Sequence, residues 1–484
     1  MTTAELAALS PLVATALTAL VAMLLAAFRR NHRLVFWVCQ LGLLAALAAV
    51  HACAPGAGTS VVGAPAAPLL RIDNFFVFFA TLFLLLAMAV AVMLAQYFRR
   101  RPECRDGAEE AYILLVVAAL GALVLAAADH FASLFIGVEL MGLASIVLVA
   151  WPSGAARDMD RLQGRSLEAG LRYLILSAAA SALLLFGIAI LYLQSGSLAF
   201  AAIPPRQGDY LILLGTGLFL AGMAFKLSVV PFHLWTADVY QGAPTPVTAL
   251  IATLTKGALI AVLLRFLAAM PPVQTQAALP ALVVLASLSM VVGNLLALRQ
   301  ENIKRLLAYS SIAHMGYLLV PVMAAGSGQL SAQAVAFYVA AYTITTLGAF
   351  SVVNGVSEGA GSDGYQVSRY RGLLWRAPWL GASFMLILLS LAGIPLTLGF
   401  VGKFYIFAAG ADARLWLPVA MVVVGSVIGL YYYLRIILAM AQSPEGGEET
   451  PGGWRERWLS YGLTALLVVL GIYPAPLVDW LPVL

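Results

Sequence analysis

Unbroken apolar runs of about twenty residues or more recur along the whole 484-residue chain. A run of this length crosses a bilayer as a helix, because each helical residue adds about 1.5 Å and the hydrocarbon is about 30 Å thick. Only 10% of the residues are charged, whereas soluble domains carry about a quarter. A membrane β-barrel would instead show alternating segments of about ten residues. The sequence therefore predicts an all-α integral membrane protein.

Charge and Pro/Gly clusters divide these runs into about fourteen predicted transmembrane helices. Their approximate limits are 10–28, 34–53, 74–98, 111–128, 131–150, 167–194, 209–234, 243–269, 278–298, 303–324, 331–355, 378–409, 415–441 and 458–476.

The positive charges predict an orientation. If the N-terminus faces outside the cytoplasm, the cytoplasmic loops hold 18 of the 27 Lys and Arg residues and the outer loops hold three. Basic residues accumulate on the cytoplasmic side of membrane proteins. We therefore expect a multi-pass membrane protein with both termini outside the cytoplasm. The same placement explains the net charge of +5 without a nucleic-acid partner.

Two five-helix units are predicted within the chain. Because each unit has an odd number of spans, the second is inverted relative to the first. The fourth helix of each unit is broken, around Pro231 in FKLSVVPFHLW and around Pro395 in LAGIPLTLGFVGKF. Each proline frees the carbonyl four residues earlier, at Leu227 and Leu391. Paired breaks in inverted halves are typical of an ion site at the bilayer midplane, and two ordinary proline kinks are the alternative.

The predicted division has four parts. An N-terminal three-helix segment covers 1–110, the first repeat covers 111–270, and the second repeat covers 271–441. A C-terminal loop and last helix cover 442–484. The cysteines Cys39, Cys53 and Cys104 are isolated, and no metal, haem, iron–sulfur or nucleotide motif is present. We therefore expect no cofactor on this chain.

Three of the four lysines lie inside predicted spans, at Lys226, Lys256 and Lys403. A charge at a helix centre costs about 2.5–3.5 kcal/mol on insertion scales, so the three together cost on the order of 8–10 kcal/mol. Arginine keeps its proton, whereas a lysine taken out of water can release one. Proton transfer requires this distribution, with lysine inside the spans, where burying a charge costs most, and arginine in the loops, where it costs little.

Glu139 is the one acidic residue deep within a predicted span, and it needs a cationic partner. Lys226, beside the first break, is the candidate. An ionised Glu139 close to Lys226 would hold the proton on the lysine, and its movement or neutralisation would release that proton. The alternative is a static buried pair that fixes the helix register.

Lys256 and His314 lie near the middle of their spans, and Lys403 follows the second break. Gly257 leaves room beside Lys256 for water or a neighbouring helix; a lysine that reaches toward the surface is the alternative. His314 lies among Ser and Tyr hydroxyls, where an imidazole can relay protons, although a hydrogen-bonded core histidine is the usual alternative. Lys403 is the predicted last station before release.

Four segments resemble the antiporter-like membrane subunits of respiratory complex I, the proton-pumping NADH:quinone oxidoreductase, and most closely the subunit N family. These segments are SLFIGVEL, FKLSVVPFHLWTADVYQGAPTPV, NIKRLLAYSSIAHMGYLL and LSLAGIPLTLGFVGKFY. With the number of spans, the resemblance covers nearly the whole chain.

This resemblance implies a proton-translocating enzyme subunit without a redox site of its own. NADH, FMN, iron–sulfur clusters and quinone are then expected on other subunits, and further antiporter-like subunits are expected as partners. Residue by residue, Glu139 and Lys226 match the family's ion pair, Lys256 its central lysine, and Lys403 its terminal lysine. His314 matches a histidine of the second half.

A subunit of a multisubunit Na⁺/H⁺ antiporter is the alternative function. Such a secondary transporter has closely related halves and would use the same buried lysines, so the local chemistry does not separate the two functions.

Overall fold

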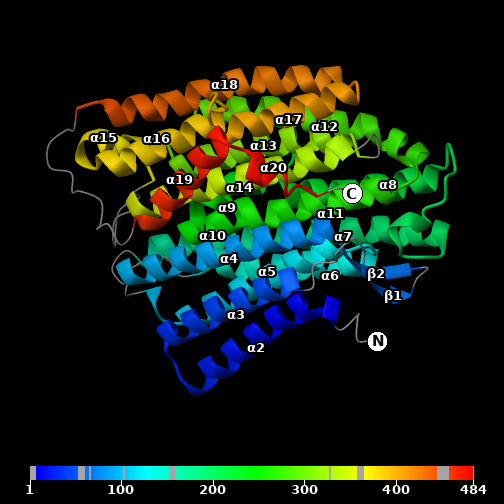
Figure 1. Cartoon of the computed structure of the whole chain (residues 1–484), viewed down its shortest axis with the longest axis horizontal. Helices are drawn as coiled ribbons and strands as arrows, with labels where there is room; N and C mark the ends of the chain where they lie inside the picture. Colours follow the sequence, from blue (N-terminus) through cyan, green and yellow to red (C-terminus); the bar gives the residue numbers. More distant parts are fainter. Residues whose placement is uncertain are drawn as a thin grey trace.

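The computed structural model describes residues 7–52, 60–64, 67–101, 104–151, 159–325, 329–356, 365–443 and 457–482. Nearly all of this chain is helical, and the long helices lie side by side (Figure 1). Helices α2 and α3 form one edge of the molecule, and α18 lies at the opposite edge.

The described part of the N-terminal segment contains three long helices and a hairpin. The helices are α2 (Ser10–Phe28), α3 (His32–Ala52) and α4 (Asn74–Arg100), and the hairpin pairs β1 (Ser60–Ala64) with β2 (Ala67–Ile72) in antiparallel register. Sequence reasoning did not predict this hairpin, which is short and lies outside the apolar runs. Cys53 lies outside the described residues.

In the described residues, the range of the first predicted repeat contains five helical units. They are α5 (Ala108–Ala127), α6 (Phe131–Val149), α7 (Met159–Ser195), the broken pair α8 (Tyr210–Leu227) and α9 (Leu234–Gly242), and the continuous column of α10 (Thr245–Leu250), the π-helix η3 (Ile251–Thr255) and α11 (Lys256–Ala269).

The second predicted repeat has the same order. It consists of α12 (Pro272–Leu298), α13 (Ile303–Met323), α14 (Gln329–Val356), the broken pair α16 (Pro378–Ala392) and α17 (Leu398–Asp412), and α18 (Trp416–Ala441). The chain continues to α19 (Trp458–Ile472) and α20 (Ala475–Val478). The remaining short helices are η2 (Phe200–Ala202), η4 (Val367–Tyr370) and α15 (Leu373–Arg376).

Every predicted span contains helix. In the described residues, 12 helices are long and apolar enough to cross a membrane, and Pro378–Ala392 and Trp458–Ile472 are shorter apolar helices. The span predicted at 378–409 consists of two shorter helices, since α16 ends at Ala392 and α17 begins at Leu398. The all-α membrane fold is thus confirmed, while the four-part division of the chain stays a prediction.

Both predicted breaks are present. Helix α8 ends at Leu227, and Ser228 adopts a left-handed backbone conformation with φ 64° before Pro231. Helix α16 ends at Ala392, and Gly393 and Leu396 have φ of 83° and 69° on either side of Pro395. The chain therefore stops being helical inside the bundle at the two places where proline removes a helical donor.

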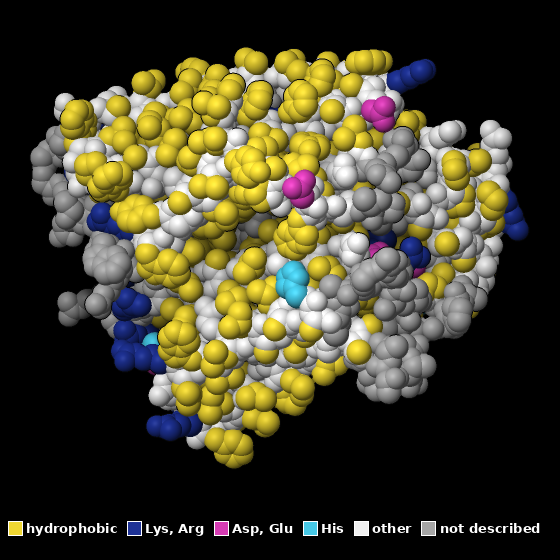
Figure 2. Space-filling model, in the orientation of Figure 1, with side chains coloured by type: hydrophobic (Ala, Val, Ile, Leu, Met, Phe, Trp, Pro, Cys, Tyr) yellow, Lys and Arg dark blue, Asp and Glu magenta, His cyan; other side chains and the backbone are white. Residues whose placement is uncertain are grey.

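Burial identifies the centre of the bundle. The 18-residue apolar window of Thr245–Ala269 is 100% buried, and those of Ile303–Met323 and Leu330–Val356 are 94% buried, whereas that of Ser10–Phe28 is 33% buried. The outer helices expose large apolar side chains, and Figure 2 shows such side chains over the broad face, with most Lys and Arg side chains near the ends of the molecule. The column that carries Lys256 and the helix that carries His314 are thus the most enclosed.

Candidate proton-transfer site

Glu139 on α6 and Lys226 on α8 lie beside one another. Lys226 Nζ is 3.7 Å from Glu139 Oε1 and donates a 2.7 Å hydrogen bond to Ser177 Oγ. Ser181 donates a 2.5 Å hydrogen bond to the same Glu139 oxygen. Ser177 and Ser181 are one turn apart on α7, so a single helix face hydrogen-bonds both members of the ion pair.

The two members of this pair differ in exposure. The side chain of Lys226 is 5% exposed, whereas that of Glu139 is 29% exposed at the surface of the isolated chain. The carboxylate can therefore meet groups outside this chain, and the ammonium group cannot.

Lys256 begins α11 directly after the π-helix η3, in the middle of its column. It is 1% exposed, and its Nζ donates a 2.7 Å hydrogen bond to Ser311 Oγ on α13. Ser311 is also 2.6 Å from the Tyr342 hydroxyl of α14, and Lys256 Nζ lies 5.5 Å from the centre of the Tyr240 ring. π-Helical turns inside α-helices are frequent at functional sites.

Gly257 packs closely against neighbouring helices. A Cβ at this position would lie 3.1 Å from Phe83 and 3.2 Å from Val339, on α4 and α14. Of the two uses that the sequence left open for this glycine, the structure shows close helix packing.

His314 is enclosed by hydroxyl groups from several helices. Its Nδ1 is 2.6 Å from the Tyr338 hydroxyl of α14, and its Nε2 is 3.5 Å from the Tyr433 hydroxyl of α18. Tyr433 is in turn hydrogen-bonded to Ser310. The His314 ring centre also lies 5.3 Å from that of Tyr342, which bonds Ser311.

Lys403 on α17 turns back toward the break. Its Nζ donates hydrogen bonds to the carbonyls of Ala392, at 2.8 Å, and Leu391, at 3.3 Å. Gly393 has a φ of 83°, which favours glycine, and a Cβ there would lie 2.8 Å from Lys403 Cδ and displace the lysine side chain. Lys403 Nζ also lies 5.4 Å from the centre of the Tyr317 ring.

These contacts link Lys256 of the first half to the polar residues of the second half in one polar line. Lys256, Ser311 and Tyr342 are connected by hydrogen bonds, and Tyr342 packs against His314. Tyr317 lies between His314, at 5.4 Å between ring centres, and Lys403. Asn294 donates to the Tyr317 hydroxyl at 3.0 Å and accepts from Tyr432 at 3.1 Å. The line from Lys256 to Lys403 is therefore made of hydroxyls, an imidazole and an amide.

Other polar residues hold the framework together. Asp238 bridges Arg172, at 3.1 Å, and Arg305, at 2.6 Å. The Trp235 indole donates to the Phe225 carbonyl, and Arg435 donates to the carbonyls of Leu298 and Gln300. These residues fasten the ends of helices, and none of them lies on the polar line.

Sequence reasoning missed several members of the network. They are Ser177, Ser181, Asn294, Tyr338, Tyr342, Tyr432 and Tyr433. The spacing of Ser177 with Ser181 and of Tyr338 with Tyr342, four residues in each case, was the available signal, since it places each pair on one helix face.

Within the described residues, no group of three His, Cys, Asp or Glu side chains is arranged to hold a metal ion. Cys39 and Cys104 are buried and do not form a disulfide with each other.

A helical membrane bundle with two broken helices and buried lysines on a hydroxyl-lined path has the architecture of an antiporter-like cation translocator. Residues 128–429 match the family described as NADH:quinone oxidoreductase/Mrp antiporter, TM, and the chain belongs to this family. It is 45% identical over 99% of its length, and 95% of the relative's, to the NADH-quinone oxidoreductase subunit N of Methylococcus capsulatus (strain ATCC 33009 / NCIMB 11132 / Bath).

Solved structures of related chains have the same fold. A chain of respiratory complex I from Thermus thermophilus is 35% identical with a TM-score of 0.82, covering 97% of this chain and 98% of that one. A chain of the Mrp complex from Dietzia sp. DQ12-45-1b has a TM-score of 0.81 at 22% identity, over 99% of this chain and 96% of that one, and shows the fold alone. The predicted membrane subunit of a proton-pumping NADH:quinone oxidoreductase is thereby confirmed.

Proposed function

We propose that protons cross the membrane through this chain along Lys226, Lys256, His314 and Lys403, under the control of Glu139. Glu139 holds a proton on Lys226 while the two are paired, and its separation or neutralisation releases that proton toward Lys256. Ser311 and Tyr342 then connect Lys256 to His314, and Lys403 receives the proton beside the second break.

This proposal rests on the neutral surroundings of Lys256 and Lys403. Among the described residues, no carboxylate lies within ion-pair distance of Lys256 or Lys403, and their ammonium groups bond to a hydroxyl and to carbonyls. A purely structural lysine in hydrocarbon pairs with an acid, because an unpaired buried charge is costly. A lysine held only by neutral groups is able to exist without its proton.

The redox chemistry that drives this movement takes place elsewhere in our proposal. NADH, FMN, iron–sulfur clusters and quinone belong to other subunits, and further antiporter-like subunits lie alongside this chain in the bilayer. The 29% exposure of Glu139 supports this arrangement, because an acid at the surface of the isolated chain is in reach of a neighbour. We place the assembly in a bacterial inner membrane, with both termini outside the cytoplasm.

The identity levels favour this role over the Na⁺/H⁺ antiporter alternative. The match to subunit N is 45% identical, against 22% for the chain of the Mrp complex. Proton pumping that is independent of sodium is therefore expected.

The decisive variant is Lys256→Ala in the intact complex, reconstituted into vesicles. We expect the complex to assemble and the pumping rate to fall at least about tenfold, since a positioned proton carrier contributes about 10²–10⁴ in rate. The control is Thr253→Val on the same column, because the Thr253 hydroxyl bonds only its own helix, at Ala249. Wild-type pumping by Lys256→Ala would remove this lysine from the path.

A further inference from the structure

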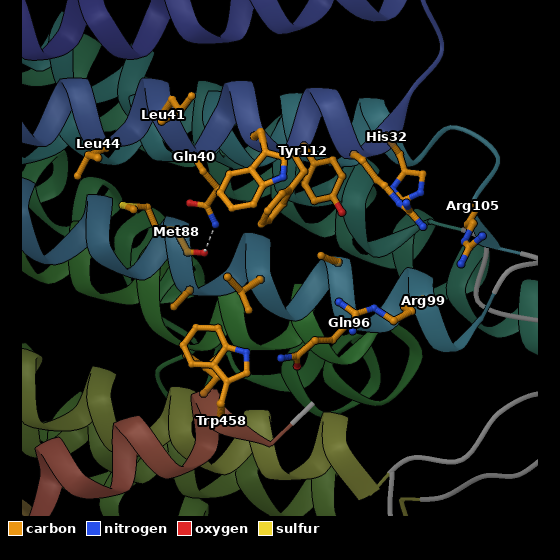
Figure 3. Close-up of a pocket in the computed structure, with 17 residues that line it drawn as sticks. His32, Gln40, Leu41, Leu44, Met88, Gln96, Arg99, Arg105, Tyr112 and Trp458 are labelled. Carbon is orange, nitrogen blue, oxygen red and sulfur yellow. Dashed lines mark hydrogen bonds between the residues drawn. The ribbon is translucent and has the colours of Figure 1, made fainter. Parts of the chain in front are cut away.

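A cavity of about 750 Å³ lies between the N-terminal helices and the rest of the bundle, away from the proton-transfer site. Its walls come from α3, α4, the start of α5 and the start of α19. Figure 3 shows it as an elongated groove, with His32, Arg99 and Arg105 at one end and Leu41, Leu44 and Met88 at the other.

The charged end of this groove is basic. His32 and Arg33 at the start of α3 line this end together with Arg99 at the end of α4. Arg105, after the following turn, also lines it. Among the described residues, neither Arg33 nor Arg99 has a side-chain hydrogen bond or an ion pair, whereas Arg105 donates to the Phe98 carbonyl. Two guanidinium groups are therefore free to bind an anion.

Three buried side chains inside the groove carry polar atoms without hydrogen-bond partners in the part of the chain that the structure describes. Gln40, Gln96 and Tyr112 line it and are 8%, 4% and 0% exposed. Gln40 Oε1, Gln96 Nε2 and the Tyr112 hydroxyl have no hydrogen-bond partner in the described residues. Because a buried polar atom without a partner costs about 1–3 kcal/mol, the two unpaired donors, Gln96 Nε2 and the Tyr112 hydroxyl, favour an occupant with acceptor groups just below its charge.

The remaining length of the groove is apolar. From Arg33 to Leu44 the wall of α3 rises over 11 residues, about 16 Å at 1.5 Å per residue. This length matches half of the roughly 30 Å hydrocarbon core, which is the depth that one acyl chain reaches. The occupant thus needs an anionic head, polar groups beneath it, and apolar chains about one leaflet long.

We propose that this groove is a binding site for one anionic phospholipid of the leaflet that borders the basic end. Its phosphate binds Arg33 and Arg99, and its ester carbonyls accept from Gln96 and Tyr112. Its acyl chains lie between α3, α4 and α19, beside Leu44 and Met88. Basic pockets between transmembrane helices on the cytoplasmic side are a recurring place for acidic lipid headgroups. Such a lipid would stabilise the packing of α3 against α4 and α19.

The test compares three forms of the intact complex in nanodiscs of phosphatidylcholine with one-fifth phosphatidylglycerol. They are the wild type, Arg33→Gln/Arg99→Gln, and the control Arg29→Gln/Arg299→Gln, which removes two exposed arginines that do not line the groove. We expect a forked density with its head between Arg33 and Arg99 in the wild type and control only. We also expect the double variant to retain one phosphatidylglycerol fewer per complex after detergent washing.

A second variant covers the case in which the double variant does not assemble. Val92→Phe adds a ring to the apolar wall and leaves both arginines in place. It is expected to lose the same lipid. Equal phosphatidylglycerol in the wild type and the variants would overturn the proposal. So would a quinone or a helix of another subunit in the groove.

Discussion

The ammonium group of Lys403 donates a hydrogen bond to the backbone carbonyl of Leu391, 3.3 Å away. This carbonyl has no helical partner, because the residue four positions later is Pro395 and lacks an N–H. The break and the lysine therefore form one site, in which the interrupted helix supplies the acceptor that holds the charge.

The first half holds its lysine differently. Lys226 bonds Ser177 and pairs with Glu139, and no described side chain donates to the Leu227 carbonyl freed by Pro231. The charge on Lys226 thus follows the state of an acid, whereas the charge on Lys403 is held by neutral dipoles.

This difference predicts the effect of exchanging Lys403 for a permanent cation. In Lys403→Arg the charge remains but the proton is not released, so we expect an assembled complex whose pumping falls at least about tenfold. The measurement is proton uptake per NADH oxidised in vesicles. The reverse exchange at an exposed position near the end of the same helix, Arg414→Lys, serves as control and should pump normally. Full pumping by Lys403→Arg would show that this lysine only positions the break.

A second prediction concerns the counter-charge of Lys226. In Glu139→Gln the ion pair is lost while the side-chain volume is kept, so Lys226 no longer retains its proton through this acid. We expect slower NADH:quinone turnover and slower pumping together. Glu168→Gln is the matched control, because that carboxylate is 57% exposed and bonds Arg172 at the surface. Turnover at the wild-type rate in Glu139→Gln would assign the pair to helix register alone.

Residues that are costly to place inside a transmembrane helix could be predicted from the sequence. Lys226, Lys256 and Lys403 were found because charge in a long apolar run has few explanations, and Pro231 and Pro395 located the breaks because proline cannot continue a helical ladder. The ion pair followed from there being one deep acid, Glu139.

The hydroxyl network could not be predicted in the same way. Tyr338 and Tyr342 lie in an apolar helix, where tyrosine packs as an ordinary core or interface residue, and only the packing of α13 against α14 brings them to His314 and Ser311. The repeat nevertheless contains the signal. The third helix of each half, α7 and α14, carries a hydroxyl pair four residues apart beside the titratable groups.

The third prediction tests this network. Tyr338→Phe removes the hydroxyl that lies 2.6 Å from His314 and keeps the ring. We expect pumping to fall several-fold with assembly unchanged, because His314 loses the partner of its Nδ1. Tyr370→Phe is the control, since this fully buried hydroxyl has no partner in the described residues and lies outside the line. Equal pumping rates in the two variants would separate Tyr338 from the path.

The last prediction separates structural charge from functional charge. Arg265 is 2% exposed, and its guanidinium binds both oxygens of Asp73 at 2.9 Å and the Ala126 carbonyl at 3.1 Å. Removing one partner of a buried pair costs about 3–5 kcal/mol, and here the Asp73 carboxylate, which is only 18% exposed, would lose its cation. Arg265→Met should therefore inactivate much faster on heating, with normal proton-to-NADH stoichiometry in the molecules that remain folded. In Arg172→Met the lost pairs are more than half exposed on the arginine side, at 54%, and cost about 0–1 kcal/mol. A normal heat-inactivation rate in Arg265→Met, with reduced stoichiometry, would instead show that the charge of Arg265 supports proton transfer rather than stability.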